Sequence, residues 1–333
     1  MAADIDAAPP ACSLYEPGAM VTFSPLGDDL APMVDTRADL AYEAEVHAAA
    51  FERAGLEPSD RVANTFGYHL FGTGEVLQRG LEELGAEVFP LGPGDSEQAA
   101  ELIEAYEIDC LLGNPSFAQK IADQGASVET FVGAGEPFTS VPGYREQLKE
   151  ALGAETAIDY FGTRQFLPIA VETAAEDGLR VAEEYAIVEL IDPDTGEALE
   201  PGQRGELVVT HRHKEGMPLV RYRTGDLAEL ERRGDDLVIP EGVIGRTDDR
   251  LKVKGVKLYP KAVPSVLAGF EGLTGEFRLE VDREATDRLT VVCEGTADRE
   301  ALGAALADRL LVSPDEVRTV DELEETGVVD RRY

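Results

Sequence analysis

The sequence predicts an α/β protein in which a doubly wound parallel sheet is followed by a β-rich subdomain and a small α+β C-terminal domain. Three observations lead to this prediction. Between residues 38 and 160, helical and strand-like patterns alternate, which is typical of a parallel sheet covered by helices on both faces. Beyond Gly178, short alternating segments are separated by turn residues, as in an antiparallel subdomain. Beyond Gly255, helical and strand-like patterns return.

The first expected element is a helix over residues 38–54, where apolar positions recur with helical spacing and Gly55 follows as a stop signal. Further helices are expected at 75–84, 97–106, 117–124 and 144–152, alternating with strands at 61–66, 87–91, 109–113, 128–133 and 156–160. In such sheets ligands bind beyond the carboxyl ends of the strands.

The later elements are shorter. Strands are expected at 186–191, 205–210, 226–230 and 236–239, followed by a helix at 261–269, strands at 275–281 and 288–294, a helix at 299–311 and a strand at 316–320. We therefore expect a disordered N-terminus over residues 1–19, an α/β core over 20–175, a β-rich subdomain over 176–248 and a C-terminal domain over 249–333.

The net charge is extreme: the chain has 66 acidic and 30 basic residues, which give a net charge of -36. Such a polyanion repels nucleic acid, so nucleic acid is not an expected partner. Acidity spread along the whole chain, with only seven lysines, indicates a surface adapted to high salt, where self-repulsion is screened.

Cysteine and histidine offer little metal or redox chemistry. The three cysteines lie far apart without a CxxC motif, which fits a reducing cytoplasm and predicts neither a disulfide framework nor a cysteine zinc site. His211 and His213 flank Arg212 on an expected strand and would share one face. A polar strand face is favoured over a metal pair, because no third ligand is near. No metal site is expected.

Targeting signals are not evident in the sequence. The first residues lack a basic start and an apolar run, and no apolar stretch approaches the length of a membrane span. We expect a cytoplasmic protein without a membrane partner.

The most informative segments are residues 219–226, Leu-Val-Arg-Tyr-Arg-Thr-Gly-Asp, and residues 245–255, which begin Gly-Arg-Thr-Asp-Asp-Arg. An aspartate after a Thr-Gly turn, here Asp226, can accept hydrogen bonds from two vicinal ribose hydroxyls, and Arg246 can reach phosphate or ribose oxygens. Each segment alone could instead be a surface hairpin with solvated charges. Their combination and order favour a nucleotide site.

Further segments match in the same order, at residues 64–71, 133–137, 176–181, 191–193 and 205–208. From about Met20 to the C-terminus, the chain resembles the phenylacetate-coenzyme A ligase branch of the adenylate-forming superfamily. The resemblance implies a protein that joins a carboxylic acid to ATP, releases pyrophosphate and passes the acyl group from the adenylate to coenzyme A, while a mobile C-terminal domain rotates.

The resemblance also implies roles for individual residues. Nucleotide contacts fall on Asp226, Arg246, Phe161, Gly133, Ala134, Gly135, Glu136, Gly162 and Thr163. The acid pocket falls on Tyr68, His69 and Phe71, and the hinge on Asp248. A hinge beside a nucleotide contact is physically sensible, because a few residues there can absorb a large backbone rotation.

Lysines are concentrated beside the expected hinge. Lys252, Lys254, Lys257 and Lys261 are four of the seven lysines and fall within ten residues. Such a positive island could meet the phosphates of coenzyme A or ATP against the global field. Alternatively, these lysines neutralise neighbouring acids.

Three departures from the family pattern concern the handling of the triphosphate. The phosphate loop, Ser-Ser-Gly-Thr-Thr-Gly-Lys in the family, is Phe-Ser-Pro-Leu-Gly-Asp-Asp at residues 23–29. Here proline removes an N–H donor, leucine removes a hydroxyl, and two aspartates replace a glycine and the lysine that would bind phosphate. Gln165, preceded by Arg164, stands where a glutamate holds magnesium, and a neutral amide is a poor ligand for a hard dication. Val328 stands at the position of the catalytic lysine.

Two hypotheses follow from these patterns. The chain is an acid-coenzyme A ligase-like protein that uses ATP or AMP and coenzyme A with a small or aromatic carboxylic acid, at weakened activity and with little support for magnesium. Alternatively, it is a catalytically inactive relative that binds AMP, acyl-adenylate or coenzyme A as a sensor or partner subunit. In either case it could form a homodimer or work with a partner subunit.

Overall fold

The computed structural model describes residues 19–26, 29–141, 143–247, 251–253, 256–258, 260–283, 287–310, 312–323 and 326–331. They form two compact units, which we describe separately. Unit 1 comprises Met1–Thr139, Arg145–Thr224 and Ala228–Val243, and unit 2 comprises Ser140–Tyr144, Gly225–Leu227 and Ile244–Tyr333. Within the described residues, none of the helices combines the length and the apolar character that a membrane crossing requires.

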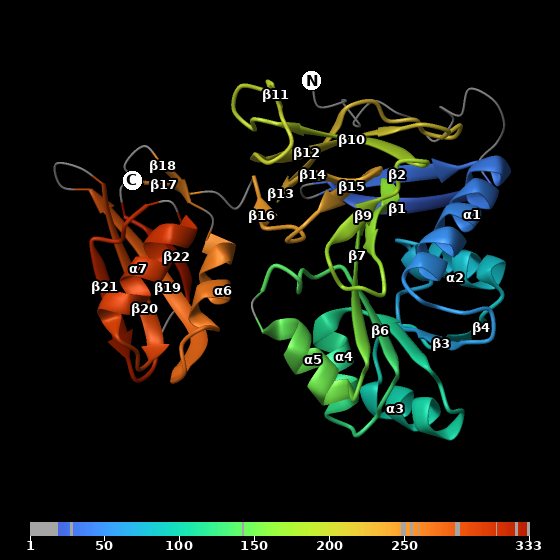
Figure 1. The fold of residues 1–333 in the computed structure, drawn as a ribbon, viewed down its shortest axis with the longest axis horizontal. Helices are drawn as coiled ribbons and strands as arrows, with labels where there is room; N and C mark the ends of the chain where they lie inside the picture. The colour runs from blue at the N-terminus through green and yellow to red at the C-terminus, as the bar shows by residue number, and fades with distance from the viewer. Residues whose placement is uncertain are drawn as a thin grey trace. The chain divides into compact units, whose positions relative to one another are not determined.

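Unit 1 is built on a nine-stranded mixed sheet in the order β14-β15-β9-β8-β7-β6-β5-β3-β4 (Figure 1). Its parallel half consists of β3 (Arg61–Asn64), β4 (Glu87–Pro90), β5 (Cys110–Gly113), β6 (Thr130–Ala134) and β7 (Thr156–Thr163). The parallel sheet expected between residues 61 and 160 is therefore confirmed.

Helices α2 to α5 connect these parallel strands, as the alternating pattern predicts, and α1 precedes the first of them. These helices are α1 (Arg37–Arg53), α2 (Thr73–Leu84), α3 (Ser96–Ala105), α4 (Pro115–Ala122) and α5 (Tyr144–Leu152). At the start of α1, the Thr36 hydroxyl accepts from the Asp39 N–H and the Thr36 N–H donates to the Asp39 carboxylate, a capping box that satisfies backbone donors without helical partners. Phe51 of α1 and Leu77 of α2 share a buried cluster with β3, β5, β6 and β7, so these two helices cover one face of the sheet.

Beyond β7 the same sheet continues with antiparallel strands, namely β8 (Phe166–Glu172), β9 (Leu179–Val181), β15 (Asp236–Ile239) and β14 (Glu231–Arg233). β8 was not expected, because every one of its residues is buried and it therefore lacks the alternation of a half-exposed strand. Residues 176–248 contribute β9, β14 and β15 to this sheet, and the boundary placed at residue 175 stays a prediction.

A second sheet of unit 1 has the order β11-β10-β12-β13, from β11 (Ala198–Leu199), β10 (Ala186–Ile191), β12 (Arg204–His211) and β13 (Tyr222–Glu229). β13 begins four residues before its expected start at Asp226, so Asp226 lies inside a strand and does not follow a turn. The described residues of the segment compared with a phosphate loop, 23–26 and 29, instead belong to the antiparallel strands β1 (Met20–Leu26) and β2 (Asp29–Asp35).

Unit 2 holds β16 (Gly245–Arg246), β17 (Leu251–Val253), β18 (Val256–Leu258), η2 (Pro260–Ala262), α6 (Val263–Leu267), β19 (Leu273–Arg283), β20 (Asp287–Gly295), α7 (Arg299–Leu310), β21 (Glu316–Val320) and β22 (Gly327–Asp330). The expected helix at 261–269 is shorter in the structure, because Pro264 lacks an N–H and fits only the first turn of α6. A four-stranded sheet in the order β21-β20-β19-β22 carries its own apolar core with α6 and α7. The edge strand β22 was not expected.

Candidate functional site

Three segments that the sequence links to the ligase reaction converge in unit 1. Strand β1 is their common point. The Thr22 hydroxyl accepts a hydrogen bond from Arg164 Nε at 2.7 Å, and the Ser24 hydroxyl accepts one from Gln165 Nε2 at 2.9 Å. The Phe23 N–H donates to the Leu70 carbonyl at 2.9 Å. The structure thus brings together the hairpin, the expected acid-pocket segment and the β7–β8 turn.

The position of the magnesium-binding glutamate does not fit a magnesium ion in this chain. Gln165 is buried and its amide donates to Ser24, while the guanidinium of the preceding residue, Arg164, places a positive charge beside it. Magnesium prefers charged or carbonyl oxygen ligands in an octahedral shell. No group of three or more acidic, histidine or cysteine side chains with metal-binding geometry occurs among the described residues.

A buried cluster of four charged side chains lies next to this turn, and we call Asp35, Glu43, Arg164 and Lys214 the Lys214 cluster. Arg164 Nη2 lies 2.5 Å from Asp35 Oδ2, and Lys214 Nζ donates to both Asp35 and Glu43. Burial alone would raise the pKa of Asp35, but the charges of Lys214 and Arg164 outweigh it and lower this pKa. Burial raises the pKa of Glu43 despite Lys214.

Sequence analysis missed this cluster, because none of its members except Arg164 falls in a recognisable motif. Lys214 is separated from Asp35 by 179 positions and from Glu43 by 171. The one available signal was a lysine in a chain with few lysines.

The expected acid-pocket residues surround the β1 contact. The Tyr68 hydroxyl is buried and has no partner with hydrogen-bond geometry, and burial raises its pKa although nearby Asn64 partly offsets the effect. The rings of His69 and Phe71 lie 6.2 Å apart, and both side chains are exposed. A buried hydroxyl without a partner costs free energy. A hydrogen bond between the Tyr68 hydroxyl and a ligand would recover that cost.

The residues expected beside the purine form the end of β6 and the turn after it. A Cβ on Gly133 would lie 2.6 Å from a ring carbon of Phe138 and 2.8 Å from one of Phe131, so only glycine fits. Gly135 has a φ of 84° and follows the buried Ala134, a conformation that favours glycine.

Glu136 in the same turn is occupied by a structural contact. Its carboxylate accepts hydrogen bonds from the Ser116 N–H at 3.0 Å and from the Ser116 hydroxyl at 2.6 Å. Ser116 lies in the first turn of α4, where backbone N–H groups lack helical partners. Glu136 therefore holds the turn against α4, and any contact with a nucleotide would be additional to this role.

The end of β7 carries the remaining nucleotide candidates of unit 1. Phe161 is half-buried and packs against the core under β8 and β12. A Cβ on Gly162 would lie 2.7 Å from Leu167 Cδ2 and 3.0 Å from the Phe166 carbonyl oxygen, so a larger residue would require the Leu167 side chain to shift. The Thr163 hydroxyl is buried and makes no hydrogen bond. Thr163 and Tyr68 thus each carry a buried hydroxyl without a hydrogen-bond partner in unit 1.

Asp226 and Arg246 lie directly opposite each other in the β13–β16 pair of unit 2. Arg246 Nη1 lies 2.7 Å from Asp226 Oδ1, and the aspartate is buried while the arginine is half-exposed. Both residues also make further interactions. A Cβ on Gly225 would lie 2.9 Å from Arg246 Nη2, so glycine allows the guanidinium to approach the backbone. The two motifs thus present a carboxylate and a guanidinium side by side.

Several predicted residues fall outside the described part of the chain. Asp248 and Lys254 are among them, as are the side chains of Lys252, Lys257 and Lys261. Within unit 2, Val328 is described: it lies on β22 opposite Leu279 and is 43% exposed. A lysine at this position would therefore meet solvent without disturbing the core.

The two histidines do not share a strand face, because β12 ends at His211 and His213 follows it. His211 is buried, stacks on Phe166 at 3.8 Å and bonds to the Gln165 carbonyl. Burial lowers the pKa of His211 to about 3. His213 instead packs edge-on against Tyr42. His211 is thus a neutral core residue, and the expectation of a shared face is wrong.

Comparison with known proteins decides the relationship. Phenylacetate-coenzyme A ligase of Thermus thermophilus is 34% identical over 267 residues, covering 75% of this chain and 59% of the relative. The Escherichia coli ligase of the same name is 31% identical over 274 residues, covering 78% of this chain and 62% of the relative. The chain is a homologue of the phenylacetate-coenzyme A ligases. It spans less than two thirds of the length of these relatives, and no family model matches it.

Solved structures show that this homologue has the adenylate-forming enzyme fold. 2-Hydroxyisobutyryl-CoA ligase in complex with R3-HIB-AMP superposes with a TM-score of 0.76 at 23% identity, covering 95% of this chain and 74% of that one. ATP-bound MatB from Rhodopseudomonas palustris superposes with a TM-score of 0.66 at 19% identity, covering 94% and 66%. The family resemblance and the fold class that were predicted from the sequence are both confirmed.

Proposed function

We propose that the chain is an acid-coenzyme A ligase that activates a small or aromatic carboxylic acid as an acyl-adenylate and passes it to coenzyme A, with a weakened adenylation step. The observation that carries this proposal is the Asp226–Arg246 pair, at 2.7 Å. The two oxygens of a carboxylate offer about four acceptor sites, so Asp226 can accept hydrogen bonds from two ribose hydroxyls beside its contact with Arg246. The homology to phenylacetate-coenzyme A ligases supports the same reading.

The chain's own residues would bind and orient the reactants. Asp226 would accept bonds from the ribose, Arg246 would contact the ribose-phosphate region, and Phe161 would stack on the adenine. Tyr68 and Thr163 offer buried hydroxyls without partners, which fit polar ligand groups. ATP would supply the activating phosphate and coenzyme A the accepting thiol. Asp248 as the hinge and Lys252, Lys254 and Lys257 as phosphate contacts remain parts of this proposal.

We expect weakened adenylation because Arg164 and Gln165 make their hydrogen bonds within the protein. Both donate their hydrogen bonds to β1, and Arg164 also pairs with Asp35. Because these groups are committed inside the protein, they are not free to stabilise a transferring phosphate, and each lost electrostatic partner typically costs orders of magnitude in rate. Magnesium has no role in this proposal, because the residues present do not fit a magnesium ion.

A second candidate function is favoured by the same commitment of Arg164. The chain would then bind AMP, acyl-adenylate or coenzyme A as a sensor or as the partner of another subunit, without turnover. Val328 at the position of the catalytic lysine supports this alternative.

A pyrophosphate-release assay with a panel of carboxylic acids in molar potassium chloride distinguishes the two, together with calorimetry using ATP, AMP and coenzyme A. Turnover that is lost in Asp226→Asn supports the ligase. Binding of AMP or coenzyme A without turnover and without a magnesium effect supports the binding protein. If no nucleotide binds at all, both proposals are wrong.

A further inference from the structure

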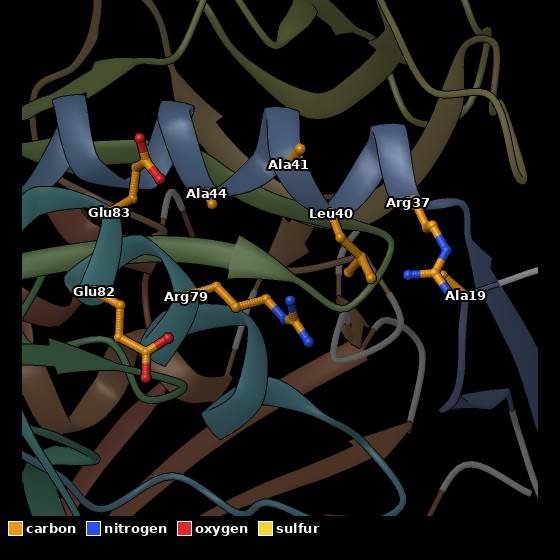
Figure 2. A pocket seen from close by; sticks show the side chains of 8 residues that line it. All are labelled: Ala19, Arg37, Leu40, Ala41, Ala44, Arg79, Glu82 and Glu83. Carbon is orange, nitrogen blue, oxygen red and sulfur yellow. The ribbon is translucent and has the colours of Figure 1, made fainter.

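A cavity of about 470 Å³ lies between α1 and α2, and none of its lining residues has been assigned a role in nucleotide or acid binding. Figure 2 shows its two kinds of wall. The side from α1 is apolar and consists of Leu40, Ala41 and Ala44, which recur on one face of the helix. The charged side comes mainly from α2.

Arg79 on α2 contributes an unsatisfied donor to this cavity. Its Nη2 lies 2.7 Å from Glu75 Oε1, whereas its Nε is buried and makes no hydrogen bond. A buried donor without an acceptor costs free energy. The Arg79 side chain lines the cavity and is 42% exposed, so its guanidinium can turn toward an acceptor on a ligand and recover that loss.

Arg37 supplies a second positive charge at the same end of the cavity. It is exposed and forms no ion pair with any residue that the structure describes. Figure 2 shows the guanidinium groups of Arg37 and Arg79 on either side of Leu40. The chain has a net charge of -36 and repels anions as a whole. Two arginines at one end of the cavity make that region locally attractive to an anion.

The opposite end of the cavity is acidic, because Glu82 and Glu83 line it. Glu82 accepts a hydrogen bond from Gln78 Nε2 at 2.6 Å, and both carboxylates repel a negative ligand group. An anion would therefore be confined to the end between the arginines, and the apolar part of the ligand would lie along the α1 wall.

We propose that this cavity binds a small organic carboxylate, whose charged group is held by Arg37 and Arg79 and whose apolar body lies against Leu40, Ala41 and Ala44. A carboxylate has two acceptor oxygens and suits a guanidinium in both geometry and charge. The small alanine side chains leave the space for the apolar body. This inference does not depend on the proposed ligase function.

The test uses the full chain and three probes in calorimetry: benzoate, uncharged benzamide and inorganic phosphate. Benzoate should bind saturably at one site, and benzamide and phosphate should bind at least about tenfold more weakly, because each lacks the charge or the apolar body. Arg79→Gln should weaken benzoate binding about tenfold or more. Ala41→Leu should weaken it similarly by filling the cavity while keeping every charge.

Arg53→Gln is the matched control, because Arg53 is an exposed α1 residue that pairs with Glu184 outside the cavity. It should leave benzoate binding unchanged, and thermal melts should show that all three variants fold. The proposal is overturned if benzoate does not bind, if neither Arg79→Gln nor Ala41→Leu weakens binding, or if phosphate or benzamide binds as tightly as benzoate. Loss of binding only in Phe71→Ala would place the benzoate in the expected acid pocket, which also overturns it.

Discussion

Arg164 and Asp35 form an almost fully buried ion pair in unit 1, with 6% and 1% of their side chains exposed and 2.5 Å between Nη2 and Oδ2. Arg164 belongs to the β7–β8 turn, and Asp35 ends the hairpin strand β2. The arginine therefore joins two segments of this chain to each other instead of remaining available to a ligand.

Replacing Arg164 by methionine should destabilise the protein by about 3 kcal/mol, because Asp35 would remain buried and would keep, among the described residues, Lys214 alone as a cationic partner. Urea unfolding measures the change. Arg53→Met is the control, since its exposed pair with Glu184 should contribute only about 0–1 kcal/mol. Equal effects of the two substitutions would show that the buried pair does not stabilise the fold.

With magnesium present, Gln165→Glu combined with Val328→Lys should raise pyrophosphate release about tenfold or more, because the glutamate supplies a charged oxygen ligand for the metal and the lysine supplies a cation for the reacting groups. Val328 is exposed on an edge strand, so a lysine there should change stability by less than about 0.5 kcal/mol. Val220→Lys changes another exposed valine and should leave the rate unaltered. No gain in the double variant would mean that the losses extend to the hairpin.

Asp226→Asn should weaken AMP binding about tenfold or more, because an amide accepts fewer hydrogen bonds than a carboxylate and carries no charge. Calorimetry with AMP measures the effect. Asp177→Asn removes an exposed aspartate that pairs with Arg180 and should leave AMP affinity unchanged. If Asp226→Asn binds AMP normally, Asp226 does not hold the ribose.

The parallel strands and their helices could be predicted from sequence because their apolar positions recur with a regular period, as in α1 and α2. Strand β8 could not, because a run of buried residues without alternation does not distinguish a strand from other buried segments. Its antiparallel direction is not encoded locally either. The hairpin β1–β2 was not predicted, because Pro25 and Pro32 lie within its strands and a proline argues against a strand assignment.

The candidate site also contains residues that the sequence predicts and residues that it does not. Asp226 and Arg246 were recognised because they belong to two short motifs, and the structure brings them into contact, although their role in nucleotide binding stays a prediction. The Lys214 cluster depends on residues more than 170 positions apart. Such a cluster arises only from tertiary packing, and no local sequence pattern predicts it.

Potassium chloride should stabilise the protein, because a net charge of -36 produces self-repulsion that salt screens. We expect the melting temperature to rise by about 5 °C or more between 0.1 M and 1 M potassium chloride, which corresponds to roughly 3–4 kcal/mol for a chain of 333 residues. Differential scanning calorimetry measures it, with sucrose of equal osmolality as the uncharged control. An equal rise in sucrose would argue against an electrostatic cause and against adaptation of the surface to high salt.

Asp159 should make stability depend on pH between about 4 and 7. Burial raises the pKa of Asp159 to about 7 from its ordinary value of 3.8, and Glu172 adds to the shift while Thr139 and Arg145 oppose it. Between these two pH values the unfolded chain has released the proton and the folded chain still holds it, so stability falls as pH rises and the loss is complete above about 7.

Asp159→Asn cannot ionise and should escape this loss. Its stability relative to wild type should therefore increase by about 2–4 kcal/mol between pH 4.5 and pH 7.5. Urea unfolding of both proteins at the two pH values measures the difference, and Glu101→Gln, which changes an exposed carboxylate of α3, should show a nearly constant difference from wild type. A constant difference for Asp159→Asn as well would mean that Asp159 is already ionised in the folded protein at pH 4.5, and that Arg145 and Thr139 stabilise its charge more than burial opposes it.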